Sequence, residues 1–452
     1  MTAPRLAYHG GLAAAGLPFL LFAGGVMGVA LSGAPDERGF WPILLAALAL
    51  GMLLAKDRRH YGETVIRGMA QPLVMVMLMA WMLSACLGVL MAESGLVKAL
   101  LWSANSLQLT AGGFTAAAFA ISCLLSFSTG SSFATILLGG PLLYPAGAML
   151  GADLPWLAGA ILAGATFGDF FAPISDTTIA SALSQDAEIG PTVKGRLRYI
   201  LPVAILCLPL YYRMGQGINT LSGTQDMPLG NPAGLPMLLL PLGIIYHVMR
   251  GRDLLHGLLL GLVAGMLWGW MLGLLPADKI FSLDKSQFQA RSILIDGINK
   301  ALGISIFTLL LMGLTETFKA SGLMDAVFSR EALRDSDYRH GEKWIAALGS
   351  AAVLLTTHSV VAILLVADFC RQTGERIGIS PSRRADLLSL VVCIFPFLLP
   401  YFIPVILMAS TSAGSTATGI PGVSPLEAGS HNMVSWGLAA MTLITLLGKK
   451  QK

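Results

Sequence analysis

The chain has 452 residues, of which 55% are hydrophobic and only 12% carry a formal charge. Soluble domains contain about 45–50% apolar and about 25% charged residues, so this chain has too much apolar surface for a water-soluble fold. The mean hydropathy of +0.72 agrees with that reading. The composition excludes a cytosolic enzyme, a secreted disulfide scaffold, a disordered chain and a coiled coil, and it favours a protein embedded in a lipid bilayer.

The net charge of +4 matters less than the positions of the basic residues. Lysine and arginine gather in short polar gaps and form no continuous basic stripe of the kind that binds nucleic acid. The gaps 56–67 and 194–198 and the tail 449–450 are rich in these residues and are expected on the cytoplasmic side. The five cysteines show no metal-ligand or redox spacing, so we interpret them as buried apolar residues and expect no cofactor.

Apolar segments recur along the whole chain, without a soluble domain between them. They are 11–32, 40–55, 69–92, 111–127, 133–150, 155–168, 199–213, 234–249, 254–275, 293–315, 344–369, 387–409 and 431–448. Several are shorter than a spanning helix or are rich in glycine, proline and serine. We therefore predict an all-α polytopic membrane protein with roughly ten to thirteen membrane segments, some of them broken or re-entrant.

The distribution of basic residues conflicts with the segment count at one place. The gaps 330–343 and 370–386 are both basic, yet a single apparent span, 344–369, separates them. Because basic loops remain on the cytoplasmic side, either this segment is a hairpin or one basic loop lies outside.

A short pattern also repeats within the chain. The segment 94–99, SGLVKA, recurs 227 residues later as SGLMDA at 321–326. The same offset pairs Thr129 with Thr356, Ser132 with Ser359, 136–138 with 363–365, and Pro173 with Pro400. The polar gaps give the two halves opposite orientations, and inverted repeats are typical of secondary transporters whose binding site lies at the repeat interface.

This repeat divides the chain into four parts. We expect N-terminal scaffold helices at 1–68, a first repeat with the ion-site motif at 69–213, linking scaffold helices at 214–292, and a second, inverted repeat at 293–452.

The most informative stretch is 168–178, GDFFAPISDTT. Asp169 and Asp176 would share one face of a continuous helix, two turns apart, but Pro173 is expected to break or kink it. The segment also supplies three hydroxyl side chains, Ser175, Thr177 and Thr178. Carboxylates, hydroxyls and freed carbonyls are hard ligands that suit a small cation such as Na⁺. The alternative is a loop in which Asp176 caps a helix, but charge between long apolar runs is costly and usually functional. We predict a Na⁺ site at Asp176 and Asp169.

Two further polar stretches interrupt apolar runs and are candidate ligands for an ion or a solute. The first contains Ser128, Thr129, Ser131 and Ser132, and its repeat partner contains Thr356, Thr357 and Ser359. Serine and threonine can instead bond to carbonyls of their own helix. Their density favours unwound segments or re-entrant tips that line a polar cavity, and we expect the two stretches to meet beside Pro173 and Asp176.

Two single ionisable residues are candidates for a proton-linked role. Glu316 follows the 293–315 segment and is equally interpretable as an interfacial anchor. His358 lies in the middle of 344–369, where an imidazole with an unperturbed pKa of about 6.5 would suit a proton sensor. The alternative for His358 is a hydrogen-bonded packing residue.

The residues around both aspartates resemble a known motif. Gly168-Asp169 followed by 172–178, APISDTT, is similar to the GD-x-x-SPLSDTT signature of the NhaC-type sodium/proton antiporters, with Ala172 where serine is usual. The upstream segment 128–132 resembles the Gly/Ser/Thr-rich segment of that family. The motif spans about 55 residues, from Ser128 to Leu183, whereas the resemblance in hydropathy and length covers most of the chain.

The resemblance implies exchange of internal Na⁺ for external H⁺ in a bacterial cytoplasmic membrane. It also implies the architecture of the ion-transporter superfamily, with two inverted repeats, re-entrant hairpins and often a homodimer. The family includes exchangers of organic acids and suspected carriers of amino acids, so the motif leaves the substrate open.

The leading hypothesis is a Na⁺/H⁺ antiporter that uses a shared carboxylate site by alternating access. The alternative is a Na⁺- or H⁺-coupled carrier or exchanger of a small organic acid or amino acid. The sequence contains no GxxxxGK[ST] motif for ATP-driven transport. An intramembrane aspartyl protease would need Gly-x-Gly-Asp, whereas Asp169 follows Thr166-Phe167-Gly168. A channel is less favoured, because paired carboxylates and inverted repeats suit alternating access.

Overall fold

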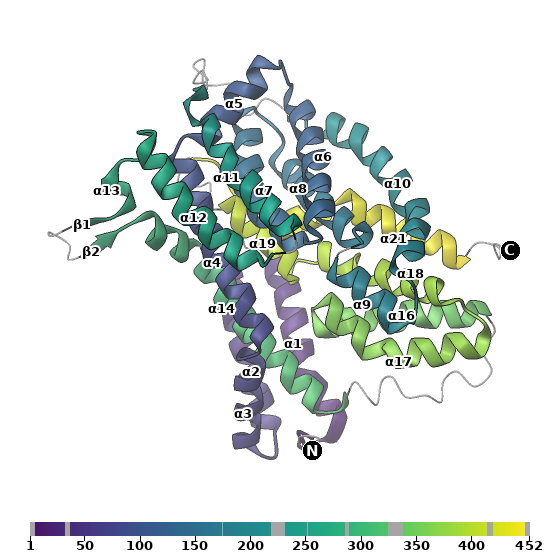
Figure 1. Cartoon of the computed structure of the whole chain (residues 1–452). Coiled ribbons are helices and arrows are strands. Elements are labelled where there is room, and N and C mark those ends of the chain that lie inside the picture. The colour runs from purple at the N-terminus through teal and green to yellow at the C-terminus, as the bar shows by residue number, and fades with distance from the viewer. Residues whose placement is uncertain are drawn as a thin grey trace.

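The computed structural model describes residues 5–31, 37–173, 175–217, 231–250, 252–284, 289–323, 338–413 and 419–447. These residues fold almost entirely into helices (Figure 1). The described strands are β1 (Ser282–Asp284) and β2 (Gln289–Arg291), which pair antiparallel with Ser282 opposite Arg291. The all-α prediction is confirmed.

The helices are numbered along the chain. The first half contains α1 (Gly11–Leu31), η1 (Glu37–Phe40), α2 (Trp41–Leu54), α3 (Arg58–Met69), α4 (Pro72–Glu93), α5 (Leu96–Ser106), α6 (Ala111–Thr129), α7 (Ser132–Met149), α8 (Leu154–Phe171), α9 (Asp176–Ser184) and α10 (Ile189–Met214). The second half contains η2 (Pro232–Leu238), α11 (Leu239–Met249), α12 (Leu254–Met271), α13 (Ala277–Ile280), α14 (Ile293–Ala320), α16 (Tyr338–Thr356), α17 (Ser359–Ile377), α18 (Pro381–Val392), η4 (Phe395–Phe397), α19 (Ile403–Ala413), α20 (Pro425–Ser430) and α21 (Met433–Leu447).

Several helices have the length and composition of membrane spans. Among the described residues, 5 segments are long and apolar enough to cross a bilayer, namely Gly11–Val29, Val74–Glu93, Ser132–Met149, Leu154–Ser184 and Ile293–Ala320. Leu20, Leu53 and Leu206 lie on outer surfaces with 65–69% of their area exposed. Such side chains are stable when lipid rather than water surrounds them, so the chain is a multi-pass membrane protein.

The polar stretch at 128–132 forms the tip of a hairpin. Helix α6 ends at Gly130, whose φ of 66° is left-handed, and Ser131 then caps α7 by accepting from the Ala134 N–H. The two helices run antiparallel, because Gly139 faces Ser122 and a Cβ at Gly147 would lie 3.0 Å from Phe114 Cδ1. The stretch is thus the tip of a helical hairpin, and its re-entry into the membrane stays a prediction.

The segment 344–369 is a second hairpin of the same kind. Helix α16 ends before Thr357, which adopts a φ of 56°, and α17 begins after His358. Gly341, on α16, packs against Ile377 at the far end of α17, so these helices also run antiparallel. The hairpin alternative is therefore correct, and it brings the described part of the first gap, 338–343, to the same end of the hairpin as the second gap.

Helix boundaries repeat at the offset seen in the sequence. Residues with positive φ pair at this spacing, namely Gly95 (78°) with Gly322 (74°), Gly130 (66°) with Thr357 (56°), and Gly151 (78°) with Gly378 (75°). Helix starts do the same, since α8 and α18 begin at Leu154 and Pro381, and α9 and α19 begin at Asp176 and Ile403. These shared boundaries support an internal duplication.

The equivalent helices α4 and α14 pack in opposite directions. Gln71, just before α4, donates from Nε2 to Oε2 of Glu316 near the end of α14 at 3.0 Å. Cys86, late in α4, donates from Sγ to the carbonyl of Leu294 at the start of α14. An inverted repeat requires this antiparallel arrangement, although the division into four parts stays a prediction.

Small residues let α8 approach α6 closely. A Cβ at Gly164 would lie 2.3 Å from Cβ of Ser122, and Ser126 Oγ donates to the carbonyl of Ala165 at 2.8 Å. This contact fixes the helix that carries Asp169 against the first hairpin.

Replacing Gly164 with alanine is expected to destabilise the protein by about 1–3 kcal/mol, because the added methyl overlaps α6. Thermal melting of the purified protein measures the effect. Gly190→Ala on α10 is the matched control, since a Cβ there would meet nothing within 4 Å. Equal melting temperatures for both variants would contradict the close packing.

Candidate functional site

A cavity of about 380 Å³ lies where the two hairpin tips meet the break between α8 and α9. Its polar lining combines residues from both tips with residues from the break, namely Ser131, Ser132, Thr357, His358, Ser359, Asp169, Asp176 and Thr177. The two polar stretches and both aspartates therefore come together in space. This is the juxtaposition that the sequence predicted for 128–132 and 356–359.

The helix breaks where Pro173 predicted that it would. Helix α8 ends at Phe171, and α9 begins at Asp176 after Ser175, so the two aspartates lie on separate helices rather than on one face. Pro173 explains the break, because proline lacks the N–H of a continuing helix and restricts the residue before it. Ile174 lies outside the described residues.

Asp169 lies at the centre of a cluster of oxygen atoms. It is only 7% exposed, and its carboxylate oxygen Oδ1 accepts from Ser175 Oγ at 3.1 Å and Thr177 Oγ1 at 3.5 Å. Its carbonyl accepts from the same two hydroxyls at 2.9 and 2.6 Å, and the hydroxyls are 2.9 Å apart. Cys393 Sγ approaches Oδ2 at 3.8 Å. A carboxylate, a carbonyl and two hydroxyls form a hard ligand set.

Asp176 differs from Asp169 in its surroundings. It is the first residue of α9, its side chain is exposed, and it lines the cavity. The cavity therefore has one accessible carboxylate, and a second one is buried in its wall among hydroxyls.

Four helices begin at the cavity. The first residues of α7, α9, α17 and α19 are Ser132, Asp176, Ser359 and Ile403, and all four line it. Helix N-termini carry partial positive charge and unpaired N–H groups, so they favour negative charge in the space between them. The cavity thus combines acidic side chains with backbone suited to an anion.

Other candidates lie away from the cavity or behind its wall. Ser175 is fully buried behind it, and Thr178 accepts from Arg196. Thr356 donates to the carbonyl of Ala352 within its own helix, which is the alternative weighed for such residues. The side chains of Ser128 and Thr129 lie outside the described residues.

The two proton-linked candidates separate. Glu316 lies on α14 beside α3, where it accepts from Gln71 and forms an ion pair with Arg67 at 3.7 Å, and it does not line the cavity. His358 lines the cavity, and its Nδ1 is buried with no hydrogen-bond partner among the described residues.

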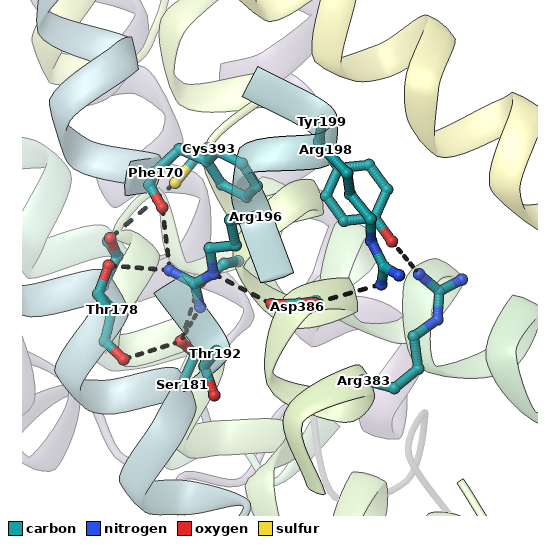
Figure 2. A network of polar contacts seen from close by, with 12 residues as sticks. Phe170, Thr178, Ser181, Thr192, Arg196, Arg198, Tyr199, Arg383, Asp386 and Cys393 are labelled. Atoms are coloured by element: carbon teal, nitrogen blue, oxygen red, sulfur yellow. Dashed lines mark hydrogen bonds and ion pairs between the residues drawn. The ribbon is translucent and has the colours of Figure 1, made fainter. Parts of the chain in front are cut away.

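A buried ion pair that the sequence did not predict lies behind the site. Figure 2 shows Arg196 of α10 between α9 and Asp386 of α18, with Nε donating to Oδ1 at 3.2 Å. In the sequence, Arg196 lies in the 194–198 gap, which is expected on the cytoplasmic side, and Asp386 lies in the basic 370–386 gap. The signal that could have found them is the position of each on a helix with apolar neighbours, where a charge needs a partner.

Part of the chain is similar in sequence to known antiporters. The profile of the Na⁺/H⁺ antiporter family matches residues 14–212, which include the first hairpin and the break. The Na(+)/H(+) antiporter NhaC of Alkalihalophilus pseudofirmus is 27% identical over 236 residues, covering 50% of this chain and 48% of that protein.

Other relatives carry different names. The Malate-2H(+)/Na(+)-lactate antiporter of Bacillus subtilis is 27% identical over 181 residues, covering 40% of this chain and 38% of that protein. The arginine/ornithine antiporter ArcD of Halobacterium salinarum is 34% identical over 107 residues, covering 24% and 22%. The matches span less than half the length of these relatives. Together with the motif, these partial matches support a relationship with the NhaC-type Na⁺/H⁺ antiporters.

Proposed function

We propose that this chain is a secondary antiporter of a bacterial cytoplasmic membrane that exchanges Na⁺ for H⁺ at the cavity between the two hairpin tips. The observation that carries the proposal is the convergence of Asp169, Asp176 and Thr177 with both tips on one cavity. The family match supports antiport as the reaction class. Lipid surrounds the protein, and a homodimer stays a prediction.

The proposed mechanism uses one carboxylate for both ions. Ionised Asp176, exposed to the cavity, would bind Na⁺ together with oxygen atoms of Asp169 and Thr177. Protonation would neutralise the carboxylate and release the cation, so the site holds either ion but not both. Movement of the site between the two sides of the membrane while it carries one ion then gives exchange.

Reconstitution into liposomes with an internal pH-sensitive dye tests the proposal. An outward Na⁺ gradient should drive proton uptake. Separate measurements replace Na⁺ with Li⁺ or with choline, and choline should drive no uptake. The KM for Na⁺ should rise as pH falls, because protons and Na⁺ compete for one carboxylate. A proton flux independent of Na⁺ and Li⁺ would contradict the proposal.

A second candidate is exchange of a small organic acid coupled to Na⁺ or H⁺. The cavity of about 380 Å³ has room for far more than one ion, since a water molecule occupies about 30 Å³ in the liquid. The four helix N-termini suit a carboxylate, and one relative is named for malate and lactate. Adding labelled malate, lactate or arginine separately to the same liposomes distinguishes this candidate from Na⁺/H⁺ exchange. Only a solute exchanger would move the labelled solute across the membrane.

A further inference from the structure

The guanidinium of Arg196 binds both sides of the break between α8 and α9. Arg196 is fully buried, and Nη1 donates to the carbonyl of Phe170 at 2.9 Å and to Thr178 Oγ1 at 2.8 Å. Nη2 donates to Ser181 Oγ at 2.9 Å (Figure 2). One planar group thus binds the end of α8 and the first two turns of α9.

These contacts adjoin the carboxylates of the cavity. Phe170 follows Asp169 in the chain, and Thr178 follows Thr177, so Arg196 brackets the break on the side away from the cavity. A shift of α9 relative to α8 would change the separation of the two aspartates. The fork of an arginine can bind a carbonyl and two hydroxyls at fixed angles, whereas the single ammonium of a lysine cannot.

Asp386 supplies the opposite charge from the other half of the chain. Its side chain is 3% exposed and binds Arg196 at 3.2 Å, and its second oxygen lies 3.7 Å from the half-exposed Arg198. Ser389, one turn further along α18, bonds to Ser181 at 2.9 Å. A buried arginine without this partner would place an uncompensated positive charge behind two cation-binding carboxylates.

We infer that Arg196 is a positioning residue for the cation site and that Asp386 is its counter-charge, so that this pair sets the affinity of the cavity for Na⁺. The inference rests on the proposed function, because the affinity for Na⁺ is measured through Na⁺-dependent exchange. Arg196 touches neither the cavity nor the transported ion and acts through the ends of α8 and α9.

The test is the dependence of exchange on Na⁺ concentration in liposomes for Asp386→Asn, Arg196→Lys and the double variant Arg196→Gln/Asp386→Asn. Asp386→Asn should raise the KM for Na⁺ about tenfold, because the unpaired guanidinium opposes the cation across a medium of low dielectric constant. The double variant should regain most of that affinity but turn over more slowly, because the charge balance is restored while the fork is lost. Arg196→Lys should keep the charge and lower the maximal rate.

Arg383→Gln is the matched control. Arg383 lies on α18 like Asp386, pairs with Glu342 at 2.6 Å and donates to Tyr199, and these polar partners lie outside α8 and α9. It should leave the KM for Na⁺ unchanged even where it lowers stability. A KM for Asp386→Asn within twofold of the wild type, or one that the double variant does not restore, would overturn the inference while leaving the proposed function intact.

Thermal melting of the same purified variants separates the two proposals. A wild-type protein without Na⁺-dependent flux would remove the proposed function and the affinity effect that rests on it. The role of Asp386 as counter-charge would still be tested by the melting temperatures. Asp386→Asn should melt at a lower temperature than the wild type, and the double variant should melt at a higher temperature than Asp386→Asn. Failure of the double variant to melt higher would overturn the counter-charge as well.

Discussion

Asp176→Asn is expected to abolish Na⁺-dependent proton flux in liposomes while the purified protein keeps its wild-type melting behaviour. Asparagine preserves the size of the side chain but can neither ionise nor bind a proton in exchange for Na⁺. Asp176 is exposed to the cavity at the start of α9, so the substitution breaks no buried contact. The initial rate of dye response after a Na⁺ jump measures the effect, which should exceed a hundredfold because the shared carboxylate is lost.

Asp186→Asn provides the control for this variant. Asp186 lies just beyond the other end of α9 and forms an exposed ion pair with Arg371 at 3.4 Å, away from the cavity. It also adopts a φ of 55°, which asparagine tolerates. The control should exchange at the wild-type rate. Full exchange by well-folded Asp176→Asn would remove Asp176 as the shared carboxylate.

Asp169→Asn is expected to raise the KM for Na⁺ by about tenfold or more and to change the pH dependence of exchange, because a charged oxygen ligand becomes neutral. The buried carboxylate accepts from Ser175 and Thr177, so the amide must also rearrange these hydroxyls. Initial rates over a range of Na⁺ concentrations at several pH values give both quantities.

Thr177→Ala and Thr178→Ala compare a residue that lines the cavity with a neighbour that lies behind it. Thr178 is adjacent in the sequence to Thr177, but it binds Arg196 rather than the cavity. We expect Thr177→Ala to raise the KM for Na⁺ more than Thr178→Ala does, because only Thr177 shares the oxygen cluster with Asp169.

A wild-type KM for Asp169→Asn would show that Asp169 has no part in binding the cation.

The sequence alone predicted the features that depend on local chemistry. Apolar composition identified a membrane protein, since no soluble fold buries so much apolar surface. Pro173 predicted the break after α8, because proline has no N–H to bond to the carbonyl four residues earlier and its ring clashes with that carbonyl. Clusters of hydroxyl residues around Gly130 and His358 predicted both hairpin tips, and the 227-residue offset anticipated the matching helix boundaries.

Only the tertiary structure decided which of these polar side chains share the cavity. Thr177 and Thr178 are neighbours in the chain, yet one helical residue rotates a side chain by about 100°, so one meets Asp169 and the other meets Arg196. Arg196 binds residues up to 190 positions away, and Glu316 lies beside α3 rather than at the site. Local patterns specify where a helix ends and which residues are polar, whereas the partner of a buried charge depends on how distant helices pack.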